Sequence, residues 1–348
     1  MRGVRVLAWG LALASVSVGC NNGNGAPVAF GELPGRLGAS YCSFASRCGY
    51  TALFEQGLFH SSITDCPGQA ARYFEDTTFA QYDLAIDRGT IVYHPENAGA
   101  CLAAFDGIGC GLGALSGAPP GCRETFEGRV ADGGACTLSE ECSETSSCTG
   151  SGSSCGMCFH QLQIGESCTS GGAACASGSF CTAGVCTAQV GQGGACDPMT
   201  SEACRSGLSC VPNSGDPSHG TCMAPPTAGP GEPCAMATCA TGLVCAISGT
   251  SATCRAPRTD GTCEYVVSGT DCAVGTVCNA TSPGMPGACV PYPVLASPCT
   301  TACAAPARCV NMVCQPTRRI GETCASSDEC LSSTCTAGVC VARPLCTP

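Results

Sequence analysis

Lysine is absent from this 348-residue chain, and arginine supplies all 15 of its positive charges. Catalysis through a lysine Schiff base and phosphate binding through a P-loop lysine are therefore excluded. The 26 acidic residues bring the formal net charge to -11. Because nucleic-acid binding requires basic side chains that neutralise phosphates, we do not expect nucleic acid as a partner.

Aromatic side chains are scarce as well. They make up 5% of the chain, and the single tryptophan, Trp9, lies near the N-terminus. The chain has instead 37 cysteines, 47 glycines and 23 prolines. This composition cannot supply one large hydrophobic core. It is typical of small modules in which disulfides replace the core.

The N-terminus lacks an apolar run of membrane-spanning length, because residues 6–18 are too few to cross a bilayer. Two arginines precede this run, as in a secretory signal peptide. It ends at Ser17-Val18-Gly19-Cys20, which resembles the lipobox of bacterial lipoproteins with serine in place of the usual leucine. We expect a lipoprotein signal peptide at residues 1–19 and lipidation at Cys20. An ordinary secretory leader with a chance cysteine is the alternative.

The number of cysteines supports lipidation at Cys20. The remaining 36 cysteines are an even number, so all of them can pair in an oxidising compartment. Asparagine follows Cys20, which in lipoproteins favours sorting to the outer membrane. We therefore expect a membrane partner reached through the lipid anchor, and an outer-membrane or cell-surface location, with secretion as the alternative. Residues 20–31 are predicted to be a flexible tether.

Residues 32–127 carry most of the aromatic residues, and two stripes in them have helical spacing. One stripe runs from Leu37 to Cys48 and the other from Ala71 to Ala85. Asp65 is a suitable N-cap before Pro67, and Gly89 is a suitable helix end. Residues 90–95 are expected to be extended and residues 96–105 helical.

We therefore predict that residues 32–127 form a mainly α-helical domain stapled by three disulfides. Its six cysteines are widely spaced: Cys42, Cys48, Cys66, Cys101, Cys110 and Cys122. The aromatic stripe is interpreted as core rather than as a ligand site. No nucleophile–base pair is recognisable there, so we assign no catalytic residue and no cofactor.

Residues 128–348 contain seven cysteine quartets, which we call modules 1 to 7. Five residues separate the second and third cysteines in six modules, and four do so in the last. The predicted structural disulfide cysteines are Cys136, Cys142, Cys148 and Cys155; Cys168, Cys175, Cys181 and Cys186; Cys196, Cys204, Cys210 and Cys222; Cys234, Cys239, Cys245 and Cys254; Cys263, Cys272, Cys278 and Cys289; Cys299, Cys303, Cys309 and Cys314; and Cys324, Cys330, Cys335 and Cys340. We favour pairing within each quartet, although four cysteines allow three pairings. The partners of Cys158 and Cys346 stay open.

Glycine recurs at fixed places in the modules. Modules open with a glycine turn, as in Gly165-Glu166-Ser167-Cys168, and four have a glycine third after the second cysteine. Thr145 and Pro306 take this place in modules 1 and 6. The sequence Cys-Thr-Ala-Gly-Val-Cys closes modules 2 and 7. These patterns predict short β-hairpins and loops joined by glycine turns.

The spacing Cys-x-x-Gly-x-x-Cys followed by a short gap and another cysteine resembles bacterial surface lipoproteins with Dickkopf N-terminal-like or EGF-like cysteine-rich repeats. The resemblance covers about three fifths of the chain. It implies export and partner binding, and it brings no catalytic residues to this sequence. The predicted fold class is therefore small disulfide-rich modules in tandem, preceded by a mainly α-helical disulfide-stapled domain.

Three kinds of residue could carry chemistry in this chain. Cys155-Gly156-Met157-Cys158 has the CxxC spacing of redox and zinc sites, but we interpret it as scaffold because export favours disulfides. The histidines, His60, His94, His160 and His219, are isolated in sequence. Acidic residues before the second cysteine of modules 1, 3 and 7 are interpreted as solvated turn residues rather than as cation ligands.

From the sequence we expect a non-enzymatic, lipid-anchored cell-envelope protein. Its modules are expected to form an elongated, rigid rod for adhesion, partner binding or envelope structure. The expected partner is another surface protein or a polysaccharide. A secreted protease inhibitor or other small-module binding protein is the second hypothesis, and a metal-binding cysteine-rich protein is the third.

Overall fold

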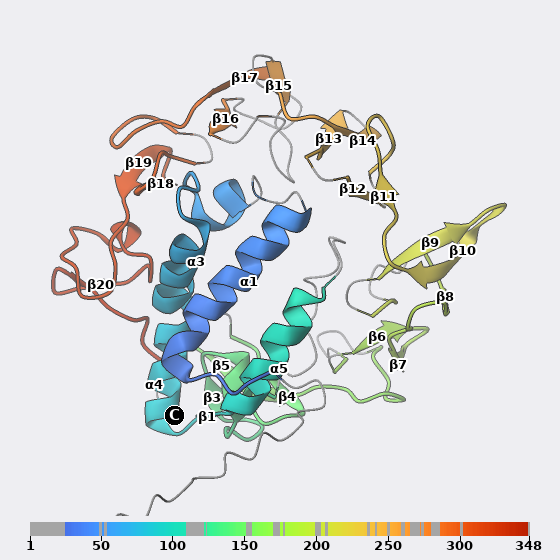
Figure 1. Cartoon of the computed structure of the whole chain (residues 1–348). Coiled ribbons are helices and arrows are strands. Elements are labelled where there is room, and N and C mark those ends of the chain that lie inside the picture. The colour runs from blue at the N-terminus through green and yellow to red at the C-terminus, as the bar shows by residue number, and fades with distance from the viewer. Residues whose placement is uncertain are drawn as a thin grey trace, which may run out of the picture.

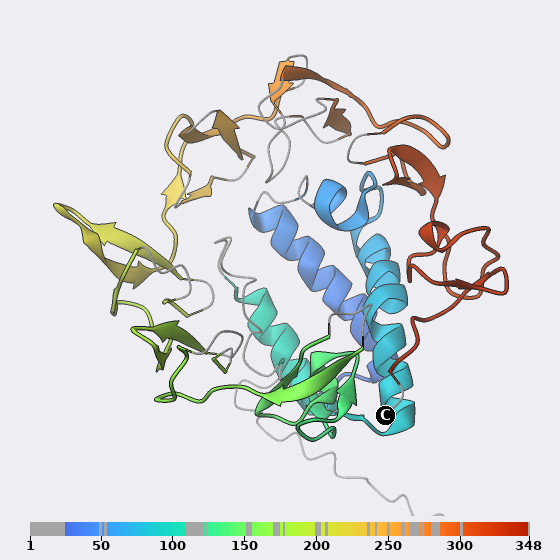
Figure 2. The same cartoon turned by 180° about the vertical axis from the view of Figure 1, so that it is seen from behind.

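The repeats run around a central helical unit as a closed ring (Figures 1 and 2). This computed structural model describes residues 25–48, 51, 54–108, 122, 124–150, 155–169, 175–176, 178–198, 203–205, 208–234, 237–240, 242–248, 251–258, 262–264, 272, 275–279, 286–299 and 302–346. The last module of the ring returns to the first, so the prediction of an elongated rod is wrong. Cys20, Cys110 and the side chain of Cys245 lie outside the described part.

The helical unit has a core of aromatic and aliphatic side chains. Its helical elements are η1 (Phe30–Glu32), α1 (Leu33–Cys48), η2 (Phe54–Phe59), α3 (Cys66–Phe74), η3 (Glu75–Phe79), α4 (Ala80–Arg88) and α5 (Pro95–Asp106). Two short strands, β1 (Ile91–Tyr93) and β2 (Phe126–Gly128), pair antiparallel at its edge. Disulfides Cys42–Cys66 and Cys101–Cys122 brace the unit. The predicted mainly helical character of this region and two of its three predicted disulfides are confirmed, while Cys110 lies outside the described residues.

The predicted helix signals lie where they were expected. The Asp65 carboxylate accepts a hydrogen bond from the Gly68 backbone N–H at 3.2 Å and so caps α3. Gly89 ends α4 in the left-handed region, with a φ of 79°. The second stripe differs in phase, because a π-helical turn, η3, lies between α3 and α4. The extra residue in this turn shifts the inward-facing position by one, so that Phe79 is buried, whereas the helical spacing predicted that Thr78 would face the core.

The predicted tether is shorter than residues 20–31. Val28 is only 1% exposed, and its backbone N–H donates to the Pro95 carbonyl oxygen at 3.0 Å. Its own carbonyl oxygen accepts a hydrogen bond from the Tyr93 hydroxyl at 2.6 Å. Phe30 packs edge-on against Tyr93, with the ring centroids 5.3 Å apart. The ordered unit therefore begins before residue 32, and these residues belong to the core.

Each module is a small strand pair or three-stranded sheet. Modules 1, 3 and 5 hold the three-stranded sheets β3–β5–β4, β8–β10–β9 and β15–β17–β16. The strands are β3 (Ala135–Cys136), β4 (Ser146–Cys148), β5 (Gly156–His160), β6 (Ser179–Thr182), β7 (Val185–Ala188), β8 (Ala195–Cys196), β9 (Ser209–Asn213), β10 (Asp216–Met223), β11 (Thr227–Ala228), β12 (Thr238–Cys239), β13 (Val244–Ser248), β14 (Ser251–Arg255), β15 (Thr262–Glu264), β16 (Thr276–Cys278), β17 (Pro286–Pro291), β18 (Ala307–Val310), β19 (Val313–Pro316), β20 (Cys335–Thr336) and β21 (Val339–Cys340). Short 3-10 turns, η5 (Ser139–Glu141) and η6 (Ser327–Glu329), occur in modules 1 and 7.

One disulfide pattern repeats around the ring. In modules 2, 3, 5, 6 and 7 the first cysteine is bonded to the third and the second to the fourth. In module 4 the second and fourth cysteines, Cys239 and Cys254, are bonded. Pairing within the quartet is therefore confirmed for modules 2, 3, 5, 6 and 7, and for one bond of module 4. The third and fourth cysteines face each other across the hairpin, as Cys181 and Cys186 do.

The predicted glycine turns are present, with one shift of position. The residue three before the first cysteine has a positive φ in six modules: Gly133, Gly165, Gly193, Gly231, Ala296 and Gly321. In modules 1 and 3 the turn therefore uses the first glycine of a Gly-Gly pair. Ala183 and Gly184 both have positive φ and close the predicted module 2 hairpin, which fits a primed turn.

Module 1 departs from within-quartet pairing. Cys158, not Cys155, faces Cys148 across β4 and β5, and Cys158 is bonded to Cys142. Cys136 is bonded to Cys148, and Cys155 is bonded to Cys346 at the other end of the repeats. The predicted place of Cys155 in the module 1 quartet is therefore wrong. The Cys155–Cys346 bond joins residues 191 apart in sequence and closes the ring.

The ring is attached to the helical unit at several points along its seam. The Arg319 guanidinium binds Asp76 at 3.1 Å, and the Tyr292 hydroxyl donates to the buried Glu55 carboxylate. Ser61 pairs with Cys303 of module 6, and the Ser62 N–H donates to the Cys303 carbonyl at 2.8 Å. At the closure, Leu345 is buried in the helical core and the Arg88 guanidinium donates to the Cys346 carbonyl.

Candidate functional site

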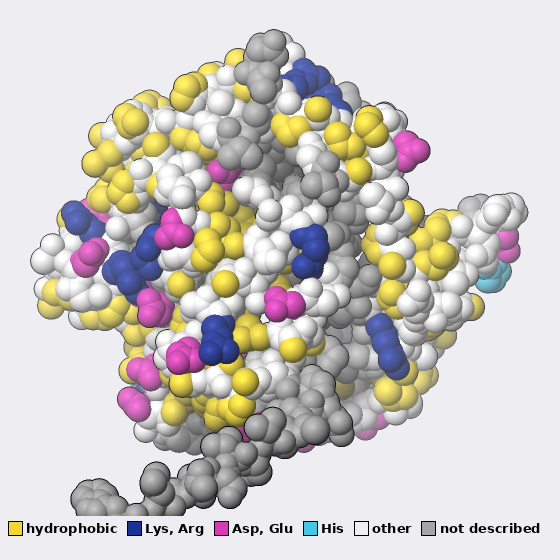
Figure 3. Space-filling view, viewed as in Figure 1, with side chains coloured by type: hydrophobic (Ala, Val, Ile, Leu, Met, Phe, Trp, Pro, Cys, Tyr) yellow, Lys and Arg dark blue, Asp and Glu magenta, His cyan; other side chains and the backbone are white. Residues whose placement is uncertain are grey.

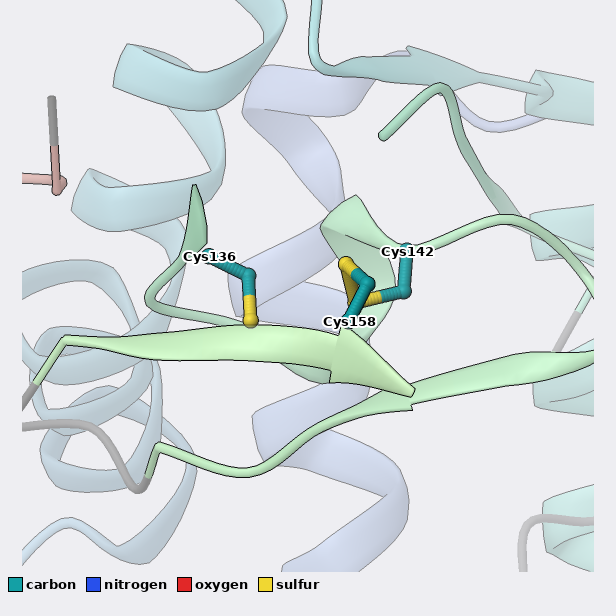
Figure 4. A group of neighbouring side chains, drawn as sticks. All are labelled: Cys136, Cys142 and Cys158. Atoms are coloured by element: carbon teal, nitrogen blue, oxygen red, sulfur yellow. A yellow bond between two sulfur atoms is a disulfide. The ribbon is translucent and has the colours of Figure 1, made fainter. Parts of the chain in front are cut away.

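The cysteine clusters are disulfide knots. Sulfur atoms of Cys136, Cys142 and Cys158 lie within 4.8 Å of one another, which is a spacing suitable for a metal ion. Figure 4 shows, however, that Cys142 and Cys158 are bonded to each other. Cys136 is bonded to Cys148, which the figure does not draw. A sulfur atom in a disulfide is not a thiolate, and metal ligation by cysteine requires the thiolate. These groups therefore serve as covalent cores in the oxidised protein.

The CxxC segment is not a redox pair in this structure. Cys155 and Cys158 belong to two different disulfides, one closing the ring and one bracing module 1. A thioredoxin-like site needs the two cysteines of the motif to bond each other at a helix start. Here Cys158 lies on β5, a strand, and Cys155 directly precedes that strand. The interpretation of these cysteines as scaffold is supported.

Two histidines approach acidic side chains. His94 Nε2 lies 3.0 Å from a Glu127 oxygen, at the edge of the β1–β2 pair. His160 lies 3.9 Å from Asp132 and 4.0 Å from Glu166, which are ion-pair distances rather than hydrogen bonds. A nucleophile positioned on either ring is not seen among the described residues. We therefore interpret both as polar contacts at the surface.

His219 is the one histidine that the structure places with both a hydroxyl and a carboxylate. Its Nδ1 lies 2.8 Å from Asp216 Oδ2 and 3.1 Å from Ser218 Oγ on the exposed hairpin of module 3. In a hydrolase triad the base contacts the acid through one ring nitrogen and the nucleophile through the other. Here both partners share Nδ1, so this trio does not have triad geometry. The Ser218 hydroxyl also donates to Asp216 Oδ1 at 2.5 Å, and this hydrogen bond, followed by the one with His219, holds the pKa of Asp216 below its ordinary value.

The acidic residues before the second cysteine do not all face solvent. Glu141 of module 1 is 2% exposed, so its interpretation as a solvated turn residue is wrong. Its Oε2 accepts the backbone N–H groups of Thr137 at 2.7 Å and Leu138 at 3.0 Å. Its Oε1 accepts the Thr90 hydroxyl of the helical unit at 2.9 Å. Glu141 therefore joins module 1 to the helical unit.

Acidic side chains also close the opening turns of the modules. Glu166, Glu232 and Glu322 each follow the positive-φ glycine, and each accepts the backbone N–H three residues earlier. The distances are 2.6 Å, 2.6 Å and 2.8 Å, as expected for charge-assisted hydrogen bonds. These carboxylates have a structural role, because they satisfy backbone donors at the turn.

The surface of the ring carries exposed apolar pairs at equivalent positions. In module 2, Ile164 is 63% exposed and Val185 is 40% exposed; in module 6, Leu295 and Val313 are 56% and 41% exposed. The same backbone hydrogen bonds frame both pairs, since Gly165 donates to Cys186 and Ala296 donates to Cys314 at 2.8 Å. Sequence reasoning missed these pairs. The signal was available as an apolar residue four before the first cysteine.

Module 6 adds further apolar surface beside its pair. Val294 and Met312 are 63% and 65% exposed, and the Cys299 N–H donates to the Met312 carbonyl at 3.0 Å. We call Val294, Leu295, Met312 and Val313 the module 6 patch. Exposed apolar clusters of this kind mark interaction surfaces more often than isolated side chains do. The module that carries the patch is held rigidly, because Ser61 and Ser62 pair with it.

Within the part of the chain that the structure describes, no helix has the length and apolar character needed to cross a membrane. The predicted lipidation site, Cys20, precedes the described residues and stays a prediction. Compared with known proteins, the chain matches no family model, no curated protein and no solved structure. The disulfide-rich modular architecture therefore rests on the structure itself.

Proposed function

We propose that this chain is a non-enzymatic, lipid-anchored protein of the bacterial cell envelope that binds another protein through its repeat ring. The observation that carries the proposal is the module 6 patch. Four exposed aliphatic side chains on one disulfide-braced module favour an apolar protein surface over a polysaccharide, whose recognition relies on polar groups.

The corrected tether length sharpens the anchoring part of the proposal. Gly25 begins the described residues, five positions after Cys20. Five fully extended residues reach at most about 18 Å. A diacylated or triacylated Cys20 would therefore hold the ring close to the membrane surface instead of projecting a rod away from it.

Two measurements test the anchor. Mass spectrometry of the mature protein from a bacterial host should find acylated Cys20 at its N-terminus. The variant Cys20→Ser should move the protein from the membrane fraction to the soluble fraction. Cleavage at another residue, or membrane retention of the variant, would contradict the anchor.

A crosslinking experiment tests the binding surface. The double variant Val294→Ser and Leu295→Ser should reduce crosslinking of the anchored protein to a specific envelope protein at least tenfold. Gln192→Ser is the matched control, because it changes the equivalent position of module 3, which is already polar. Equal crosslinking by the double variant and the control would refute the module 6 patch as the contact.

A further inference from the structure

A cavity of about 330 Å³ opens on the seam between the helical unit and the C-terminal part of the ring. The helical unit contributes Phe59, His60 and Tyr73 to its wall, and the ring contributes Arg308, Ser332 and Arg343. Arginine side chains gather on this side of the molecule, where the segment around β20 meets α3 (Figure 3). The cavity exists only because the ring folds back onto the helical unit.

Arg308 is fixed in its orientation at this cavity. Its guanidinium donates to the backbone carbonyl oxygens of Asp328 and Cys330, the latter at 3.0 Å. Its Nε is buried without a hydrogen-bond partner among the described residues. Burial lowers the pKa of Arg308 and the nearby Asp328 carboxylate opposes this, but an arginine side chain stays protonated in proteins. The wall therefore carries a permanent, partly unsatisfied positive charge.

Ser332 supplies an independent observation that points to a ligand. Its side chain is 5% exposed and lines the cavity, yet its hydroxyl has no hydrogen-bond partner within the described residues. Buried hydroxyl groups are nearly always paired, and an unpaired one calls for a ligand or an ordered water. A hydroxyl donor in the same cavity wall as two arginine side chains matches an anionic acceptor.

We infer that this seam cavity binds a small organic carboxylate, with its acid group at Arg308, Arg343 and Ser332 and its apolar body against Phe59 and Tyr73. The volume lies at the lower end of pockets that hold small molecules. The planar arginine fork matches a carboxylate in two hydrogen bonds. The aromatic side chains favour a ligand with a ring or an alkyl body over a bare inorganic ion. This inference does not depend on the proposed partner binding.

Calorimetry on the full mature chain, oxidised and in detergent, tests the inference with benzoate as the probe. Benzoate should bind, while benzamide, which has the same shape without the charge, should bind at least tenfold more weakly. Phenyl phosphate tests the other anion class. Absence of benzoate binding, equal binding of benzamide, or tighter binding of phenyl phosphate would each overturn the inference.

Three variants locate the site. Arg343→Gln and Ser332→Ala should each weaken benzoate binding about ten- to a hundredfold, because each removes a donor to a charged group. Arg129→Gln is the control, since Arg129 is an exposed arginine paired with Glu127 outside the cavity wall. Unchanged affinity in both cavity variants would place binding elsewhere and refute the site.

Ser332→Ala also distinguishes an effect on ligand binding from an effect on the stability of the fold. Its hydroxyl is unpartnered without ligand, so the variant should melt at the same temperature as the wild type or higher in the absence of benzoate. Benzoate should then raise the melting temperature of the wild type more than that of the variant. A variant that melts lower without ligand would show that the hydroxyl has a structural partner, and this would remove the basis of the inference.

Discussion

The helical unit and the repeat ring are stabilised by different kinds of interior. The helical unit excludes water with aromatic rings, as in the stacked pair Tyr41 and Phe105, whose centroids are 4.6 Å apart. The modules bury sulfur instead, and Cys222 and Cys263 have no exposed surface. Each module of the ring is therefore stabilised by its own disulfides, while one shared hydrophobic core stabilises the helical unit. We therefore expect a destabilising substitution to loosen the whole helical unit, whereas in the ring its effect should stay within one module.

The largest expected effect comes from breaking the shared core. Phe44 is 1% exposed and packs near Phe105, so Phe44→Ala should lower the free energy of unfolding by about 3–5 kcal/mol. The matched change in the ring, Cys204→Ser with Cys222→Ser, removes one disulfide and should cost about 3 kcal/mol. Hydrogen exchange should then show that Phe44→Ala loosens all helices, whereas the cysteine pair loosens module 3 alone. Loss of protection in α1 on removing the module 3 disulfide would contradict the comparison.

The ring closure is where the two regions depend on each other. Cys155–Cys346 spans 191 positions, and chain entropy alone would give such a bond about 5 kcal/mol. The disulfides in between already shorten the effective loop, so we expect Cys155→Ser with Cys346→Ser to cost about 2–4 kcal/mol. Because Leu345 is buried in the helical core, exchange should rise in the C-terminal segment and in α4 together.

A short-range disulfide supplies the control for the closure. Cys168→Ser with Cys181→Ser removes a bond across 13 positions within module 2, and protection of the helical unit should not change. The closure would lose its assigned role if both pairs of substitutions affected the helical unit equally.

Glu141 tests the contact between module 1 and the helical unit on a smaller scale. Glu141→Ala leaves the backbone donors of Thr137 and Leu138 and the Thr90 hydroxyl without their acceptor. We expect a cost of about 1–3 kcal/mol in chemical denaturation. Glu329→Ala at the equivalent position of module 7 should cost less than about 1 kcal/mol, because Glu329 accepts one backbone N–H near the surface. Equal costs would show that Glu141 does not join the two regions.

The local structure followed from the sequence because its signals are local. Helical spacing located α1, a capping aspartate located the start of α3, and a cysteine hairpin with Ala-Gly located β6 and β7. The π-turn η3 was missed, since one added residue changes the phase of a stripe without changing its composition. Within the modules, the predicted pairing held wherever the third and fourth cysteines flank one hairpin.

The global arrangement could not be derived from spacing. Cys155 follows Cys148 in sequence and was therefore counted as the fourth cysteine of module 1, but strand register places Cys158 opposite Cys148. Several contacts of the ring with the helical unit join residues more than two hundred positions apart, such as Glu55 and Tyr292. Nothing in the immediate sequence around either residue indicates its partner. The seam cavity has the same origin, because its wall comes from five separate segments.

The smallest expected effect concerns the buried Glu55 on the seam. Burial raises the pKa of Glu55 above its ordinary value, although hydrogen bonds from Tyr292 and the Ile63 backbone lower it. A carboxyl group with a raised folded-state pKa contributes stability that is complete below its unfolded pKa and is lost as the pH rises through its folded pKa. The wild type should therefore lose a little stability on account of this group as the pH rises above the ordinary pKa of a glutamate carboxyl. Glu55→Gln keeps an acceptor for the Tyr292 hydroxyl and removes the titration, so its denaturation midpoint should change less with pH than that of the wild type.

Asp83→Asn is the control, because it removes the same charge from an exposed position on α4. Its denaturation midpoint should change with pH with the same slope as that of the wild type. A Glu55→Gln slope identical to both would mean that the seam carboxylate is as well solvated as a surface acid, and the ring would then not exclude water from the helical unit.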